Sequence, residues 1–125
     1  MNATYYHRTT PAAAEAILAT GFRDATGSYM LEDELTGVFI SDVPLDMNEG
    51  AKATAVNGAL LAIEIGAELV EPYEIVEDGR SFREFCVPAE ALNAHGDIRL
   101  LTEAEADEAD ERGWEIRRKR AGIEE

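Results

Sequence analysis

A carboxylate interrupts an apolar strand pattern late in the chain. Residues 81–87 read Ser-Phe-Arg-Glu-Phe-Cys-Val, and strand alternation places Glu84 on one side with Phe82 and Cys86. Burying an unpaired carboxylate is costly, so Glu84 must be paired, lie at an edge or face a pocket. We expect it to face a solvent-reachable pocket as a functional carboxylate. The structural alternative is an ion pair with a nearby arginine: Arg8, Arg80 or Arg83.

A histidine stands out in the same way near the start of the chain. Residues 4–9 read Thr-Tyr-Tyr-His-Arg-Thr, a run of aromatic and β-branched side chains that predicts a strand. Period-two alternation puts His7 on one face with Tyr5 and Thr9. A strand histidine either binds a ligand or is a hydrogen-bonded part of the structure, and its position alone does not decide between the two.

The other chemistry-bearing residues form no familiar catalytic motif. The sequence contains no GxGxxG, P-loop, GxSxG or HExxH pattern. Ser41 has no evident His–Asp relay beyond His7, which argues against a serine hydrolase. Two histidines, His7 and His95, and the one cysteine, Cys86, do not make a convincing metal site without carboxylates. A single cysteine also excludes an internal disulfide framework.

The segments that must position these side chains alternate between short strands and helices. Thr10-Pro11 has the form of an N-cap followed by proline at the first helical position. The alanine-rich run to Thr20 then predicts a helix that ends at Gly21. Further strands are expected at 37–41, 59–65, 81–87 and 98–101. The residues between them predict a loop at 22–36, a loop holding a short helix at 45–58, a turn at 78–79 and one helical turn at 88–92. Residues 69–76 are interrupted by Pro72 and predict an edge strand or an irregular crossing.

A capping box opens the C-terminal segment. Thr102-Glu103-Ala104-Glu105 combines an N-cap threonine with a glutamate three residues later, which predicts the start of a helix. Acidic residues fill its first turns, and residues 117–120 (Arg-Arg-Lys-Arg) close it, an order that favours the helix dipole. The dipole is a sufficient explanation of this basic cluster, and a nucleic-acid patch is the weaker alternative.

Short strand signals without a regular βαβ alternation predict an α+β fold, with mostly antiparallel strands around a cleft. The 125 residues fit a single domain. We assign residues 1–101 to that domain. Residues 102–125 form an acidic helix and charged tail, packed on the domain or extending from it.

The charge of the chain limits its partners. Eleven lysines and arginines against 26 aspartates and glutamates give a formal net charge of −15. Such a surface disfavours general binding to a nucleic-acid backbone, and it suits a basic protein partner. The longest apolar stretch, 59–63, is far shorter than the ~20 residues that cross a bilayer, and the start lacks the pattern of a signal peptide. We therefore expect a cytoplasmic protein without a membrane segment.

Four segments together resemble the ADP-ribosyltransferase fold. They are residues 6–10 (Tyr-His-Arg-Thr-Thr), the helix that ends at Gly21-Phe22, residues 37–42 (Gly-Val-Phe-Ile-Ser-Asp) and residues 83–88 (Arg-Glu-Phe-Cys-Val-Pro). The pattern is most similar to the His–Tyr–Glu branch, which includes poly(ADP-ribose) polymerase catalytic domains, small rifampin ADP-ribosyltransferases and RNA 2′-phosphotransferases. The resemblance covers residues 4–101 and implies a split sheet around an NAD cleft.

The resemblance implies roles for three residues of the first strand. His7 matches the histidine that hydrogen-bonds ribose hydroxyls of NAD. Arg8 stands where the family usually has a glycine whose backbone holds the nicotinamide carboxamide. The sequence departs from the family at this position, and the departure implies that the arginine side chain either narrows the pocket or meets a phosphate. Thr9 matches the threonine of the family's His-Gly-Thr motif.

The resemblance also assigns roles on two later strands. Phe39 takes the place of the aromatic residue, often tyrosine, that stacks on the nicotinamide ring, and phenylalanine keeps the stacking without the hydroxyl. Ser41 falls just beyond it and is expected to face the same cleft. Glu84 matches the glutamate that binds the ribose 2′-hydroxyl and assists transfer.

The function implied is NAD-dependent mono-ADP-ribosyl transfer, with NAD as substrate, no metal, and a protein or small molecule as the unknown acceptor. The alternatives are a non-catalytic acidic binding module of the same fold, an NAD glycohydrolase, or an unrelated α+β domain in which His7 and Glu84 are structural. An RNA 2′-phosphotransferase is disfavoured, because those enzymes usually carry an extra N-terminal helical domain and more basic residues. Convergence of His7, Phe39 and Glu84 on one cleft would favour the enzyme, whereas His7 and Glu84 on opposite faces of the sheet would argue against it.

Overall fold

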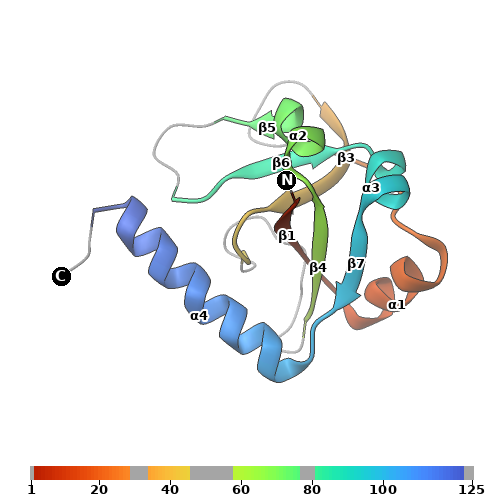
Figure 1. Cartoon of the computed structure of the whole chain (residues 1–125). Helices are drawn as coiled ribbons and strands as arrows, with labels where there is room; N and C mark the ends of the chain where they lie inside the picture. The colour runs from red at the N-terminus through yellow and green to blue at the C-terminus, as the bar shows by residue number, and fades with distance from the viewer. Residues whose placement is uncertain (1, 29–33, 46–57, 77–80, 123–125) are drawn as a thin grey trace.

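The computed structural model describes residues 2–28, 34–45, 58–76 and 81–122 (Figure 1). Along the chain lie β1 (Asn2–Thr9), α1 (Pro11–Thr20), β2 (Ala25–Ser28), β3 (Glu34–Ser41), β4 (Ala59–Gly66), α2 (Ala67–Val70), the 3₁₀ helix η2 (Glu71–Tyr73), β5 (Glu74–Ile75), β6 (Glu84–Val87), α3 (Ala89–His95), β7 (Asp97–Leu100) and α4 (Glu103–Arg120). Helices and antiparallel strands form the α+β fold that the sequence predicts.

The sheet is built from two halves that meet at one residue pair. Its strands pair antiparallel in the order β5-β6-β3-β1-β4-β7, and β2 pairs with β3. β1 lies against β4 along its whole length, as far as Thr9↔Ala59, whereas β1 and β3 share only the pair Tyr6↔Ser41. In Figure 1, β3 and β6 run across the view while β4 and β7 run down it. We call the place where β1 and β3 separate, beyond Tyr6↔Ser41, the seam.

One face of the sheet holds the hydrophobic core. Residues that lie opposite one another on paired strands project to the same face. The core face carries the fully buried Ile40 and Phe85 beside the buried Tyr5, whose ring meets that of Phe85 edge to face at 5.3 Å. Ala14 of α1 and Leu92 of α3 are buried in the same apolar cluster. These two helices therefore cover the core face.

The opposite face lies under the C-terminal helix, and we call it the α4 face. It carries Tyr6, Ser41 and Glu84 at matching positions on β1, β3 and β6. The Asp110 carboxylate of α4 accepts a hydrogen bond from Arg8, the next residue of β1 on this face. Figure 1 shows α4 on the other side of the sheet from α1 and α3.

The first helix, α1, has the bounds that the sequence predicts. Thr10 accepts a hydrogen bond from Ala13 N–H through its side chain, and Pro11 occupies the first helical position. Gly21 follows with a φ of 92°, a conformation that favours glycine. A Cβ at this position would lie 2.9 Å from the Asn93 side-chain oxygen, so a larger residue would also displace the end of that side chain.

Some predicted elements differ in the structure. The loop expected at 22–36 is wrong, because β2 and the first half of β3 pair with each other in that range. The edge segment at 69–76 is mostly helical: Pro72 lies in the first turn of η2, where a missing N–H costs little, and only β5 is extended. The helical turn expected at 88–92 extends to His95, and β6 begins only at Glu84. Most of the loop at 45–58 and the turn at 78–79 lie outside the described residues.

The C-terminal helix begins at the predicted capping box. Glu105 N–H donates to the Thr102 hydroxyl at 3.1 Å, and Thr102 N–H donates to the Glu105 carboxylate at 2.9 Å. These two bonds satisfy amide groups that the first turn of a helix otherwise leaves unpaired. The sequence prediction for this helix is therefore confirmed.

We expect Thr102→Ala to lower the free energy of unfolding by about 1 kcal/mol, the usual effect of removing an N-cap hydroxyl. Urea unfolding of the full chain measures the change. Thr20→Ala is the matched control, since the Thr20 hydroxyl donates to a carbonyl, that of Ala16, within its own helix and caps no N-terminus. Equal effects of the two substitutions would contradict a specific capping role for Thr102.

Candidate functional site

His7 lies in the seam between the two half-sheets. Strand alternation puts it on the core side, with Tyr5, and its ring packs edge to face on Phe22 at 5.3 Å. Its Nδ1 lies 2.8 Å from the backbone oxygen of Phe39 on β3. The imidazole therefore provides a contact between β1 and β3 at a place where their backbones no longer pair.

The Phe39 contact fixes the tautomer of His7. A carbonyl oxygen only accepts, so Nδ1 of His7 carries the proton and Nε2 becomes the acceptor nitrogen of the neutral ring. Burial lowers the pKa of His7 below its usual value, and the hydrogen bond to Phe39 offsets this only in part. Burial therefore favours the neutral form of His7, in which Nε2 is the acceptor nitrogen.

Asn93 positions the ring that packs on His7. Its side-chain oxygen accepts from Phe22 N–H at 2.8 Å, and its side-chain nitrogen donates to the Phe22 carbonyl at 3.0 Å. These bonds hold the backbone of Phe22 as a neighbouring strand would, and they orient its ring against His7. Asn93 does not stand out in the sequence, because its contact joins segments 71 positions apart.

Arg8 and Thr9 complete the end of β1. Arg8 projects to the α4 face, where its Nε donates to the Leu45 carbonyl and its NH2 group to Asp110, both at 2.6 Å. Its side chain is only 15% exposed. Thr9 is half-buried and is the last residue of β1 to pair with β4. The three residues His7, Arg8 and Thr9 therefore line one side of the seam.

Ser41 and Glu84 lie directly opposite one another on β3 and β6. Phe39 is half-buried on the same face, opposite Cys86. The Ser41 hydroxyl is buried and donates to the Val43 carbonyl at 2.6 Å. The pKa of Cys86 is raised by burial and by the carboxylates of Asp24 and Glu84, so this thiol is not an activated nucleophile.

The Glu84 side chain is buried, not solvent-reachable as expected. Only 5% of the residue is exposed. Among the described residues, every buried side-chain nitrogen and oxygen has a hydrogen-bond partner, so no buried oxygen of Glu84 is left unsatisfied. Segments that are distant in the sequence meet on this face: Leu45 accepts a hydrogen bond from Arg8 of β1, and Pro44 lies beside Gly113 of α4. Alternation within one strand cannot reveal a cover that comes from distant segments.

The structure brings only part of the predicted set together. Phe39, Ser41 and Glu84 share the α4 face with Arg8, on three neighbouring strands. His7 lies on the core side and reaches this group only through the seam, at the Phe39 carbonyl. His7 and Glu84 therefore do not project from one face of the sheet, and His7 approaches the others from the opposite side.

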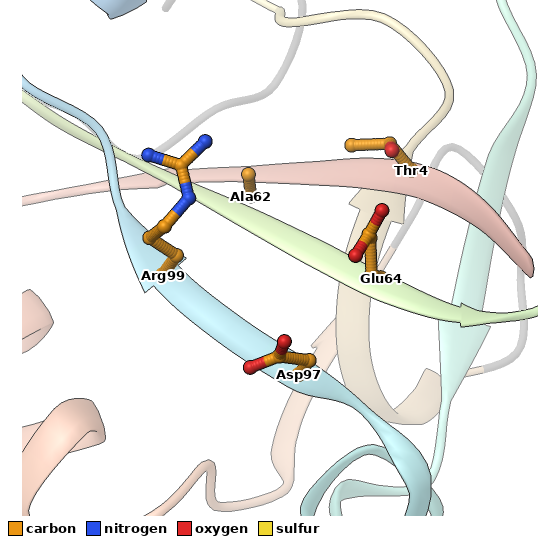
Figure 2. Close-up of a pocket in the computed structure, with 5 residues that line it drawn as sticks. All are labelled: Thr4, Ala62, Glu64, Asp97 and Arg99. Atoms are coloured by element: carbon orange, nitrogen blue, oxygen red, sulfur yellow. The ribbon is translucent and has the colours of Figure 1, made fainter.

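A shallow pocket on the other half-sheet lies apart from these residues. It has a volume of about 150 Å³ and is lined by Thr4, Ala62, Glu64, Asp97 and Arg99 of β1, β4 and β7 (Figure 2). Figure 2 shows the side chains of Glu64 and Asp97 on neighbouring strands, near that of Arg99. None of the six predicted site residues lines this pocket.

Comparisons of the chain with protein-family models, curated proteins and solved structures found no match. Within the described ranges, no group of three or more histidine, cysteine, aspartate or glutamate side chains is arranged to hold a metal ion. None of the helices in the described part of the chain is long and apolar enough to cross a membrane.

The lowered pKa of His7 predicts a loss of stability on acidification. Below about pH 6.5 the unfolded chain protonates this histidine while the folded chain does not, so the free energy of unfolding falls until the lower folded-state pKa is reached. Urea unfolding at several pH values between about 7.5 and 5 measures the slope for wild type and His7→Gln. The difference between the two curves cancels the contribution of the carboxylates. Parallel curves would show that His7 is protonated equally in both states.

Proposed function

We propose that this chain is an NAD-dependent mono-ADP-ribosyltransferase with an ADP-ribosyltransferase-like split sheet, and that NAD binds along the seam. The observation that carries the proposal is the separation of β1 from β3 after one residue pair, with a neutral His7 in the gap. The motif residues of both strands border this gap: His7, Arg8 and Thr9 on β1, and Phe39 and Ser41 on β3.

Each residue has a chemical role in this proposal. His7 accepts a hydrogen bond from a ribose hydroxyl at Nε2, which the Phe39 contact reserves as an acceptor. The backbone of Arg8 and Thr9 holds the nicotinamide carboxamide, and the Phe39 ring stacks on the nicotinamide. Ser41 lies directly opposite Glu84 on the adjacent strand, and its hydroxyl is held by the Val43 carbonyl, so its role is to pack beside the carboxylate.

The proposed reaction breaks the bond between the nicotinamide nitrogen and ribose C1′. The electron pair of that bond goes to the ring nitrogen, so nicotinamide leaves neutral and C1′ becomes an oxocarbenium-like centre. The Glu84 carboxylate stabilises this positive charge in a water-poor site. A nucleophilic atom of the acceptor then bonds to C1′ and releases its proton. NAD is the substrate, and the acceptor is a protein or small-molecule nucleophile.

A second candidate function is a non-catalytic binding module of the same fold. The observation that favours it is the 5% exposure of Glu84 beneath α4, on the opposite side of the sheet from His7. Such a module binds an ADP-ribose-like ligand at the seam, or a basic protein through its acidic surface, without breaking a bond. The transferase and a module that binds ADP-ribose would both use the seam, so turnover separates these two.

The test is nicotinamide release from NAD by the full chain, measured with and without added protein and small-molecule nucleophiles. Release that depends on an acceptor supports the transferase, and release into water alone identifies a glycohydrolase. Folded protein that binds ADP-ribose but releases no nicotinamide supports the binding module. Folded protein that neither binds NAD nor releases nicotinamide would show that the seam does not hold this nucleotide. That result contradicts both the transferase and a module that binds ADP-ribose there.

A further inference from the structure

Arg8 is a cation of the proposed site, and its guanidinium is already paired with a carboxylate of α4. The Arg8 NH2 group and Asp110 Oδ1 are 2.6 Å apart, and the side chains are 15% and 38% exposed. The Arg8 Nε is bound to the Leu45 carbonyl, which fixes the direction of the guanidinium. One edge of a half-buried, oriented cation is therefore filled by an anion from another element of the same chain.

The apolar contact between α4 and the sheet is narrow. Its buried residues Ala109, Gly113 and Arg117 are spaced four apart and form one narrow stripe. Two of the three are small, so the stripe buries little apolar surface, while Trp114 and Ile116 remain exposed. The rest of the attachment is polar.

Polar contacts join both halves of α4 to the rest of the domain. Asp110 binds Arg8 in the first half, as described. In the second half, Arg120 pairs with Asp42 at 2.9 Å and Arg117 donates to the Ser81 hydroxyl at 2.9 Å. Arg117 is buried and also lies over the Phe82 ring, so the second half of α4 is anchored more firmly. Ion pairs at partly exposed positions are weak and are screened by salt, so the first half, at Asp110, can leave the sheet at lower cost.

We infer that α4 is a lid over the α4 face, on which Glu84 lies. The contact between Asp110 and Arg8 holds this lid closed, and a ligand carrying a diphosphate opens it by replacing Asp110 on Arg8. This inference rests on the proposed function, because the lid matters only if a ligand must reach Glu84. It explains how a carboxylate that is 5% exposed in the closed chain meets a substrate. A diphosphate suits this exchange because a guanidinium binds paired anionic oxygens in a planar, bidentate manner.

The experiment compares the binding of ADP and adenosine to the full chain by calorimetry at low salt. Asp110→Asn keeps the shape of the side chain and removes the competing charge. We expect it to tighten ADP binding about fivefold, the factor that one partly exposed ion pair supplies, with adenosine binding unchanged. Asp107→Asn is the matched control: it makes the same chemical change in α4, at an exposed position.

Amide hydrogen exchange gives a second measurement that needs no substitution. Addition of ADP to wild type should speed exchange in the middle of α4, around residues 109–113, while the buried strands stay protected. Exchange that is unchanged or slowed in α4 would show that the ligand binds with the helix closed, which overturns the inference.

The outcomes separate this inference from the proposed function. Wild type that releases nicotinamide, with equal ADP affinity in wild type and Asp110→Asn, overturns the lid and leaves the transferase standing. Tighter ADP binding by Asp110→Asn without nicotinamide release by any variant supports the lid and contradicts the transferase. Failure of both proteins to bind ADP overturns the lid, because no diphosphate then reaches Arg8.

Discussion

Glu84→Gln is expected to slow nicotinamide release by about 100- to 1000-fold, while the affinity for NAD changes little. Glutamine keeps the size of glutamate and most of its hydrogen bonds but removes the negative charge. Since positive charge develops at C1′ only as the nicotinamide bond breaks, the lost stabilisation falls mainly on the transition state. The effect should therefore appear in kcat, with KM nearly constant.

The measurement needs a control that separates charge at the site from charge elsewhere. Glu64→Gln removes a carboxylate from the same face of the sheet, at an exposed position of β4 in the other half-sheet. We expect its turnover to match wild type. Thermal unfolding of both variants checks that the neutral side chain at the buried position has not disturbed the fold. A folded Glu84→Gln protein with wild-type turnover would remove Glu84 from the mechanism.

The sequence predicted the local features of the fold better than its long-range pairing. The first helix, with Thr10 as its N-cap and Gly21 after its end, and the capping box at Thr102 are fixed by neighbours a few residues apart, and all of them are confirmed. β2 was missed because it is stabilised by pairing with β3, and short strands have little signal of their own. Local patterns also hid the helical start of the 69–76 segment.

The candidate site shows the same division between local and distant information. Alternation along β1 correctly separated the His7 face from the Arg8 face, and that along β6 put Glu84 with Cys86. It could not show that Arg8 pairs with Asp110 of α4, because these two residues are 102 positions apart. Asp110 was not singled out among the many acidic residues of its helix, since all of them have similar local surroundings in the sequence.

His7→Ala is expected to weaken NAD binding about tenfold, with a smaller effect on kcat. The substitution removes the Nε2 acceptor proposed for a ribose hydroxyl and leaves the Phe39 carbonyl without its donor. It also removes the ring that packs on Phe22, so the edge of the seam becomes less ordered. Because His7 contacts the ribose before the bond breaks, the loss falls on the ground state as well as the transition state, and KM should rise.

Two further variants separate the hydrogen bond from the packing. His7→Gln places an amide at the same position and can still accept from a hydroxyl, so we expect it to recover part of the NAD affinity that His7→Ala loses. His95→Ala, at the exposed end of α3, removes the other histidine and should bind NAD as wild type does. Calorimetric titration with NAD measures all four proteins. Unaltered NAD affinity in a folded His7→Ala protein would show that the seam does not bind the ribose, and the proposed function would lose the observation on which it rests.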